Sequence, residues 1–422
     1  MRKVFALLLC FVITINAQIK FDDYFVDQTL RFDFFHTGNK TTETISFDKL
    51  VKEGQWSCPK KNLIDPFGYG NYFFKIFDLT SNNLIYSRGF STLYQEWQTT
   101  EESKNTIRSF PGSIIMPFPK EKIRVEIYRR DRKNNFVKKF DYNIDPKNYS
   151  IVDERIRPYD NFKVHYSGDP SSKLDIVFIP EGYTKAEMEK FHKDCERFAG
   201  YLFDYSPYKE NKDKINIWGI EAPSNESGTD IPAKNIWKQT LINSSFYTFD
   251  SERYLMTTDY QTVRDVAANA PYDQIFIMVN TSKYGGGAIY NFYSMTCVDN
   301  KAAKQVFVHE FAHGLAGLAD EYGNDNTYQD MYPTDVEPWE PNLTTMVNFD
   351  SKWKNLIEPG TPIPTPPEDK YKDKIGVFEG GGYVAKGVYR PTFNSIMNSF
   401  TSNEFNLVCK DVIQKIINYY SE

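Results

Sequence analysis

Histidine is rare in this chain of 422 residues, and so are cysteine, basic clusters and long apolar runs. The five histidines are His36, His165, His192, His309 and His313. With histidine this rare, the pattern His-Glu-x-x-His arises by chance on the order of a few times per thousand chains of this length. Such a spacing therefore carries weight wherever it occurs.

The cysteines are too few and too widely separated for a disulfide scaffold. Besides Cys10 near the N-terminus, they are Cys58, Cys195, Cys297 and Cys409. Four cysteines of an exported protein can pair in three ways, and the sequence does not choose among them. Their low density instead predicts buried free thiols.

Positive charge is not concentrated in any part of the chain. The formal net charge is −6, and no basic cluster is large enough to follow a phosphate backbone. We therefore expect no nucleic-acid partner. A membrane-spanning helix needs about 20 consecutive apolar residues, and because no segment is that long and apolar, we predict no transmembrane segment.

The N-terminus has the pattern of a secretory signal peptide. Two basic residues precede an apolar run at residues 4–13, and Ala17 offers a small side chain for cleavage before Gln18. Residues 1–17 are therefore predicted to be a signal peptide that is removed. The mature protein is then expected to be secreted, periplasmic or attached to the cell surface.

Aromatic residues are plentiful, at 16% of the chain, which favours strands. Residues 72–77 and 84–87 flank a turn-forming cluster, as do residues 123–128 and 136–140, and both pairs are typical of β-hairpins. No long helical pattern occurs before residue 150. Residues 18–150 are therefore predicted to form a small all-β sandwich domain.

The pattern changes to alternating strands and helices in residues 151–422. Residues 174–180 and 274–280 are nearly continuous apolar runs, typical of strands covered on both faces. Thr184 and Glu187 form a capping box that predicts the start of a helix. This alternation predicts an α/β domain.

One predicted helix, beginning near Lys301, carries the candidate catalytic residues. His309 and His313 lie four residues apart, so their side chains share one face of the helix. This spacing suits two nitrogen ligands of one zinc ion. Glu310 follows the first histidine, which completes the HExxH pattern of zinc metallopeptidases. The alternative is two surface histidines on an amphipathic helix.

The third ligand must come from a different residue type. No histidine follows His313, so a downstream ligand is an oxygen or the sulfur of Cys409. Gly317 can end the helix, and Asp320 then offers a carboxylate seven residues after His313. Asp320 is the first choice and Glu321 the second, while the alternative is that both only cap or solvate the turn.

Two further stretches resemble known zinc peptidases. The sequence around Met397, Asn-Ser-Ile-Met-Asn-Ser-Phe, resembles the methionine turn of metzincins. Metzincins place glycine three residues and the third ligand six residues after the second histidine, whereas Gly317 and Asp320 lie one position further on. That longer spacing, with Ser-Gly-Thr-Asp at 227–230 and the glycine-rich residues 379–383, is similar to the bacterial immunoglobulin A peptidase-like family.

The resemblance implies an α/β zincin domain of metzincin type, preceded by an N-terminal β-domain. It also implies zinc bound by His309, His313 and Asp320, with Glu310 as the general base that takes a proton from a zinc-activated water molecule. The expected activity is a secreted zinc endopeptidase acting on protein substrates, for example host glycoproteins such as immunoglobulin. The alternatives are a noncatalytic surface binding protein with a decayed peptidase domain, or an exopeptidase with Glu321 as third ligand.

A proline-rich stretch follows the candidate ligands. Residues 323–367 contain eight prolines together with Trp339 and Trp353, and no clear helix or strand pattern. Such a segment can line a cleft and set its specificity. Ordinary packing explains the two tryptophans equally well.

Overall fold

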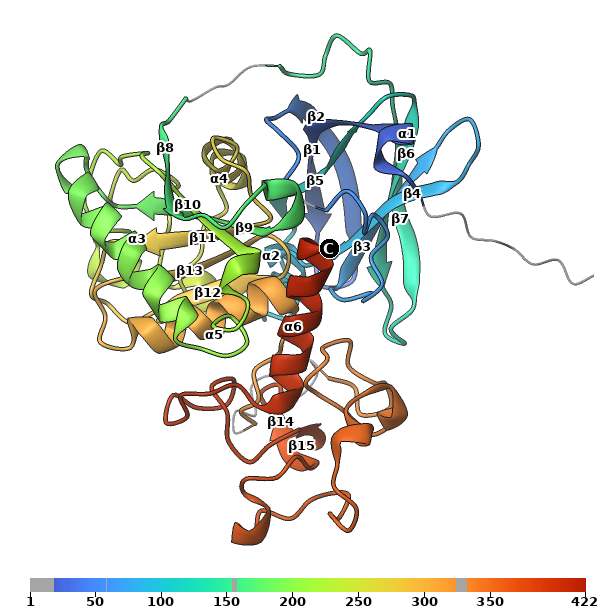
Figure 1. The fold of residues 1–422 in the computed structure, drawn as a ribbon, viewed down its shortest axis with the longest axis vertical. Helices are drawn as coiled ribbons and strands as arrows, with labels where there is room; N and C mark the ends of the chain where they lie inside the picture. The colour runs from blue at the N-terminus through green and yellow to red at the C-terminus, as the bar shows by residue number, and fades with distance from the viewer. Residues whose placement is uncertain (1–18, 58, 154–157, 324–331) are drawn as a thin grey trace, which may run out of the picture.

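The computed structural model describes residues 19–57, 59–153, 158–323 and 332–422 (Figure 1). The predicted signal peptide (1–17), its cleavage site before Gln18, and Cys58 lie outside the described residues. The remaining three cysteines are buried free thiols, as predicted: Cys195, Cys297 and Cys409. Within the described ranges, no helix has the length and apolar character needed to cross a membrane.

The N-terminal region consists of two antiparallel sheets. The first has the order β2-β1-β5 and the second β4-β3-β6-β7. The strands are β1 (Phe25–Gly38), β2 (Glu43–Lys52), β3 (Tyr72–Asp78), β4 (Leu84–Phe90), β5 (Arg108–Pro119), β6 (Ile123–Arg130) and β7 (Phe136–Ile144). Both predicted hairpins are present, as β3–β4 and β6–β7. Phe32 and Ile76, from different sheets, share one buried core, as expected when two sheets pack face to face.

The second region is built on a mixed six-stranded sheet with the order β12-β13-β11-β9-β10-β8. Its strands are β8 (Asn161–His165), β9 (Leu174–Glu181), β10 (Ile215–Ile220), β11 (Gln274–Val279), β12 (Gly286–Ile289) and β13 (Tyr293–Cys297). The four inner strands are parallel, and the two edge strands β12 and β8 are antiparallel to their neighbours.

Helices cover both faces of this sheet. The N-terminal region contributes α1 (Phe21–Tyr24), which lies against β1, and α2 (Leu93–Trp97). The second region has α3 (Met188–Phe203), α4 (Tyr260–Ala267), α5 (Ala303–Ala316) and α6 (Leu407–Ser421). Alternate side chains of β9 point to opposite faces. Phe178 packs in one buried cluster with α3 and α5, whereas Val177 packs in another with α4 and with α2 of the N-terminal region. The sheet therefore lies between a helical layer and the N-terminal region.

The C-terminal part adds a two-stranded sheet and the last helix. β14 (Phe378–Gly381) pairs with β15 (Val384–Arg390), and α6 runs from this pair to the junction of the two regions (Figure 1). The last helix begins after Asn406, because the side chain of Asn406 accepts a hydrogen bond from the backbone of Cys409 and caps the helix there.

Candidate metal centre

Helix α5 presents both candidate histidines beside the core. Phe307 and Phe311, on the same helix, are buried against the sheet. They fix the orientation of α5 about its own axis. His309 is 7% exposed. The ring centroids of His309 and His313 are 4.6 Å apart, and their Nε2 atoms are separated by 3.0 Å. The helix thus brings two imidazole nitrogens to one point.

The other nitrogen of each ring is held by a backbone carbonyl. His309 Nδ1 donates to the carbonyl of Ile396 at 3.1 Å, and His313 Nδ1 donates to that of Leu318 at 2.5 Å. A hydrogen on Nδ1 leaves the lone pair of a neutral imidazole on Nε2. The two Nε2 atoms that face each other are therefore the ones free to bind a metal.

The turn that follows α5 brings Asp320 to the same point. Gly317 ends the helix in the left-handed conformation, with φ 60°, which glycine adopts without steric cost. Asp320 Oδ1 then lies 3.0 Å from His309 Nε2 and 3.4 Å from His313 Nε2. Ligands of a tetrahedral zinc ion at 2.0–2.1 Å stand about 3.3 Å apart. This donor set of two nitrogens and one carboxylate oxygen fits a metal ion in type and spacing.

Glu321 points away from the two imidazoles. Its carboxylate is fully buried and accepts hydrogen bonds from Ser395 at 2.5 Å and from Asn406 at 2.8 Å. Cys409 Sγ is also beside Glu321, at 3.4 Å. Of the candidates for a third ligand, Asp320 alone lies with both histidines in the group that could hold a metal ion.

The stretch around Met397 contacts two parts of this site. Met397 is fully buried, and its carbonyl accepts a hydrogen bond from the backbone of Glu321 at 2.8 Å. The preceding carbonyl, of Ile396, is the one that holds His309. The predicted methionine turn therefore connects one imidazole to the chain that carries Asp320.

Glu310 lies between the helix and the edge strand β12. A Cβ atom at Gly286 would meet Glu310 Cγ at 3.2 Å and the carbonyl of Met295 at 2.9 Å, so a glycine at this position lets β12 approach α5 closely. Burial raises the pKa of the Glu310 carboxyl, and the nearby imidazoles offset part of this effect. A carboxylate whose pKa is raised toward neutral pH is suited to proton transfer.

Three polar residues near the site were missed by the sequence analysis. The hydroxyl of Tyr383 donates a hydrogen bond to Asp320 Oδ2, and the hydroxyl of Tyr322 lies 3.2 Å from that of Tyr383. Tyr383 adopts a left-handed backbone, with φ 67°, which is uncommon for a bulky residue. The only signal for Tyr383 was its place after the glycines at 380–382.

The third is Glu96, which comes from the N-terminal region. The hydroxyl of Tyr254 donates a hydrogen bond to it. Burial raises the pKa of Glu96 to about 7, and the charges of His313 and Glu310 act on it in opposite directions. The β-domain therefore reaches the surroundings of the site, although its sequence offered no catalytic pattern.

The two tryptophans of the proline-rich stretch have packing roles. Trp353 is 2% exposed, and its ring nitrogen donates to the carbonyl of Gly376. Trp339 packs against Tyr290 and donates to Asn71 of the N-terminal region at 3.1 Å. Both contacts agree with the packing interpretation. The part of this stretch at residues 324–331 lies outside the described residues.

Comparison with known families covers most of the chain. The family model described as IgA Peptidase M64 matches residues 162–374 and 367–417. The model described as Peptidase M64 N-terminus matches residues 20–141. No curated protein matches the chain.

Proposed function

The chain belongs to the IgA peptidase M64 family of metallopeptidases, and on this premise we propose that it is a secreted zinc-dependent endopeptidase. The observation that carries the proposal is the convergence of His309, His313 and Asp320, whose metal-binding atoms lie within 4.8 Å of one another. The imidazoles and the carboxylate hold the ion, and Glu310 acts as general base. Proteins are the substrate class, with host glycoproteins such as immunoglobulin as the first to test.

Different residues of the chain have different roles in the proposed peptide hydrolysis. When bound, a zinc ion supplies a Lewis acid that makes a water molecule acidic near neutral pH. Glu310 accepts a proton from the attacking water and passes it to the leaving amine. The carbonyls of Ile396 and Leu318 keep the lone pairs of the imidazoles directed at the ion.

The strand β12 passes beside Glu310. It pairs with β13 on one side, and on the other side it meets the segment around Tyr254 in an isolated bridge at Gly286. The backbone of Gly286 is used on that side, since its N–H donates to the carbonyl of Arg253 and its carbonyl accepts a hydrogen bond from Leu255. A protein substrate must therefore reach Glu310 without adding to β12 at Gly286.

The Glu310→Gln variant tests the mechanism. It removes the base but none of the three proposed ligands, so it should keep about one zinc per chain and lose hydrolysis by about 10²–10⁴-fold. Metal content is measured by mass spectrometry and hydrolysis on a protein mixture. His313→Ala is the matched control, which should lose both metal and activity.

Two results would count against the proposal. Undiminished hydrolysis by Glu310→Gln would end the assigned role of this carboxylate. A purified wild-type protein that carries no metal and cleaves nothing would favour the alternative, a noncatalytic surface binding protein. Secretion is tested separately, because the mature protein recovered outside the cytoplasm should begin at Gln18.

A further inference from the structure

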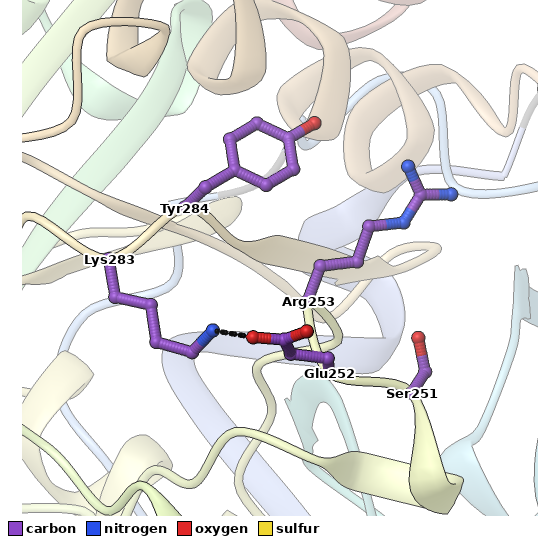
Figure 2. A pocket seen from close by; sticks show the side chains of 5 residues that line it. All are labelled: Ser251, Glu252, Arg253, Lys283 and Tyr284. Atoms are coloured by element: carbon purple, nitrogen blue, oxygen red, sulfur yellow. Dashed lines mark hydrogen bonds and ion pairs between the residues drawn. The ribbon is translucent and has the colours of Figure 1, made fainter.

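A cavity of about 440 Å³ opens at the start of the edge strand β12. It is lined by Ser251, Glu252, Arg253, Lys283 and Tyr284. Figure 2 shows Lys283 and Glu252 turned toward each other, with the guanidinium of Arg253 and the ring of Tyr284 directed away from that pair. The Lys283 Nζ to Glu252 Oε1 distance is 2.9 Å. The charge of the lysine is thus already neutralised within the cavity.

Contacts connect this cavity to the candidate metal centre. Arg253 Nη2 lies 3.5 Å from the hydroxyl of Tyr322, which lies 3.2 Å from that of Tyr383, and Tyr383 in turn bonds Asp320. The backbone of Arg253 also accepts a hydrogen bond from Gly286 of β12 at 3.3 Å. Arg253 is therefore connected to the candidate metal centre in two ways, through the phenols to Asp320 and through its backbone to β12.

The guanidinium of Arg253 has no acidic partner among the described residues. Its side-chain contacts are the phenols of Tyr322 and Tyr284, and no carboxylate oxygen of the described chain forms an ion pair with it, in contrast to Lys283. A guanidinium offers a planar fork of donors that matches a carboxylate and binds it with two parallel hydrogen bonds. The Tyr284 ring, 37% exposed, adds an apolar wall for the methylene groups of a side chain.

From this geometry we propose that Arg253 is a specificity-determining residue that binds a carboxylate of the peptide substrate. The inference rests on the proposed peptidase function and adds a substrate class to it, peptides that carry a carboxylate near the cleaved bond. That carboxylate comes either from an acidic side chain or from the C-terminus of the peptide. Both sources present the same group to the guanidinium.

Matched peptides separate the two sources. The two peptides of the first pair have an amidated C-terminus and differ only in glutamate or glutamine at one position. The pair is then repeated with this position moved along the peptide. A second pair has no acidic side chain and differs only in a free or amidated C-terminus. In one of the two pairs, the wild-type protein should prefer the peptide that carries the carboxylate over its uncharged partner, by about tenfold in kcat/KM. The difference should appear mainly in KM, because the charge-assisted contact forms on binding.

Three variants attribute the preference to Arg253. Arg253→Gln should abolish it without changing the zinc content, and Arg253→Glu should reverse it toward peptides with lysine at the same position. Lys283→Gln is the matched control, since it removes a cation of the same cavity that already has a partner, and it should keep the preference. A structural role of Arg253 would not switch the preferred charge.

The outcomes distinguish this inference from the proposed function. If the wild-type protein cleaves both members of each pair equally well, the role of Arg253 is overturned and the peptidase function stands. If the protein cleaves nothing, fluorescence anisotropy with the same labelled peptides decides. Tighter binding of an acidic peptide that is lost in Arg253→Gln supports the carboxylate site, and equal binding of all peptides overturns it.

Discussion

Asp320 and Glu321 are adjacent in the chain, yet their carboxylates lie in two separate clusters. Asp320 Oδ1 faces the two imidazoles, at 3.0 and 3.4 Å. Glu321 is turned into the protein, where it accepts a hydrogen bond from Asn342 at 3.1 Å in addition to those from Ser395 and Asn406. One carboxylate is thus available to a metal, and its neighbour joins three distant segments of the chain.

This difference predicts opposite effects for two isosteric variants. Asp320→Asn removes a charged donor and should weaken metal binding by tenfold or more, with little change in folding. Glu321→Gln should keep the metal but lower the free energy of unfolding by about 1–3 kcal/mol, since buried donors lose their acceptor. Metal content and thermal unfolding of both proteins check this, and loss of metal only in Glu321→Gln would assign the ligand to Glu321.

Tyr383 is predicted to tune the metal centre through Asp320. Tyr383→Phe removes the hydroxyl that donates to Asp320 Oδ2, and loss of such a partner typically costs 10–100-fold in metal affinity or activity. Titration with a zinc chelator measures the affinity. Tyr149→Phe is the control, because Tyr149 is 98% exposed. Equal zinc affinity and activity in the two variants would show that the hydrogen bond does not support the site.

The parts of the site that the sequence predicted are those fixed by local periodicity. His309 and His313 face one way because α5 is a regular helix, and Gly317 ends it in the conformation that glycine favours. The choice between Asp320 and Glu321 depends on Ser395 and on other residues far along the chain. No local pattern contains that information, so both remained candidates.

Residues brought to the site by tertiary packing could not be predicted. Glu96 comes from α2 of the N-terminal region, and Arg253 from the loop before α4. Neither lies in a sequence pattern typical of a catalytic site. Whether Glu96 and Arg253 lie near the candidate metal centre depends on how β12 packs against α5. The sequence of either segment alone does not determine this packing.

Arg31 is predicted to hold the two regions together. It is fully buried in β1, and its guanidinium contacts Glu53 at 3.0 Å and Asp265 of the helix α4 at 2.8 Å. Arg31→Met leaves buried carboxylates without their counter-charge and should lower the free energy of unfolding by about 3–5 kcal/mol. Denaturant unfolding measures this.

The control for Arg31 is a cation of an exposed pair. Lys354 Nζ lies 2.6 Å from Asp350 Oδ1 on the surface, and Lys354→Met should cost at most about 1 kcal/mol. If Arg31→Met is no less stable than Lys354→Met, the buried ion pairs do not join the regions.

Glu43 is predicted to make the protein sensitive to acid. Its side chain is 2% exposed and bonds His36 at 2.9 Å and Arg129 at 2.8 Å. Burial raises the pKa of Glu43, but the hydrogen bond from His36 and the positive charge of Arg129 outweigh burial and hold the pKa at about 2. The unfolded chain therefore binds this proton more readily than the folded protein.

The stabilisation from Glu43 is then complete above about pH 4.5 and lost as the pH falls toward 2. It amounts to about 3 kcal/mol, at about 1.4 kcal/mol per pKa unit. Glu43→Gln should be less stable at neutral pH and should lose less stability than the wild type between pH 4.5 and 2. Glu404→Gln, at a side chain that is 79% exposed, is the control. Equal acid slopes for Glu43→Gln and the wild type would contradict the assignment.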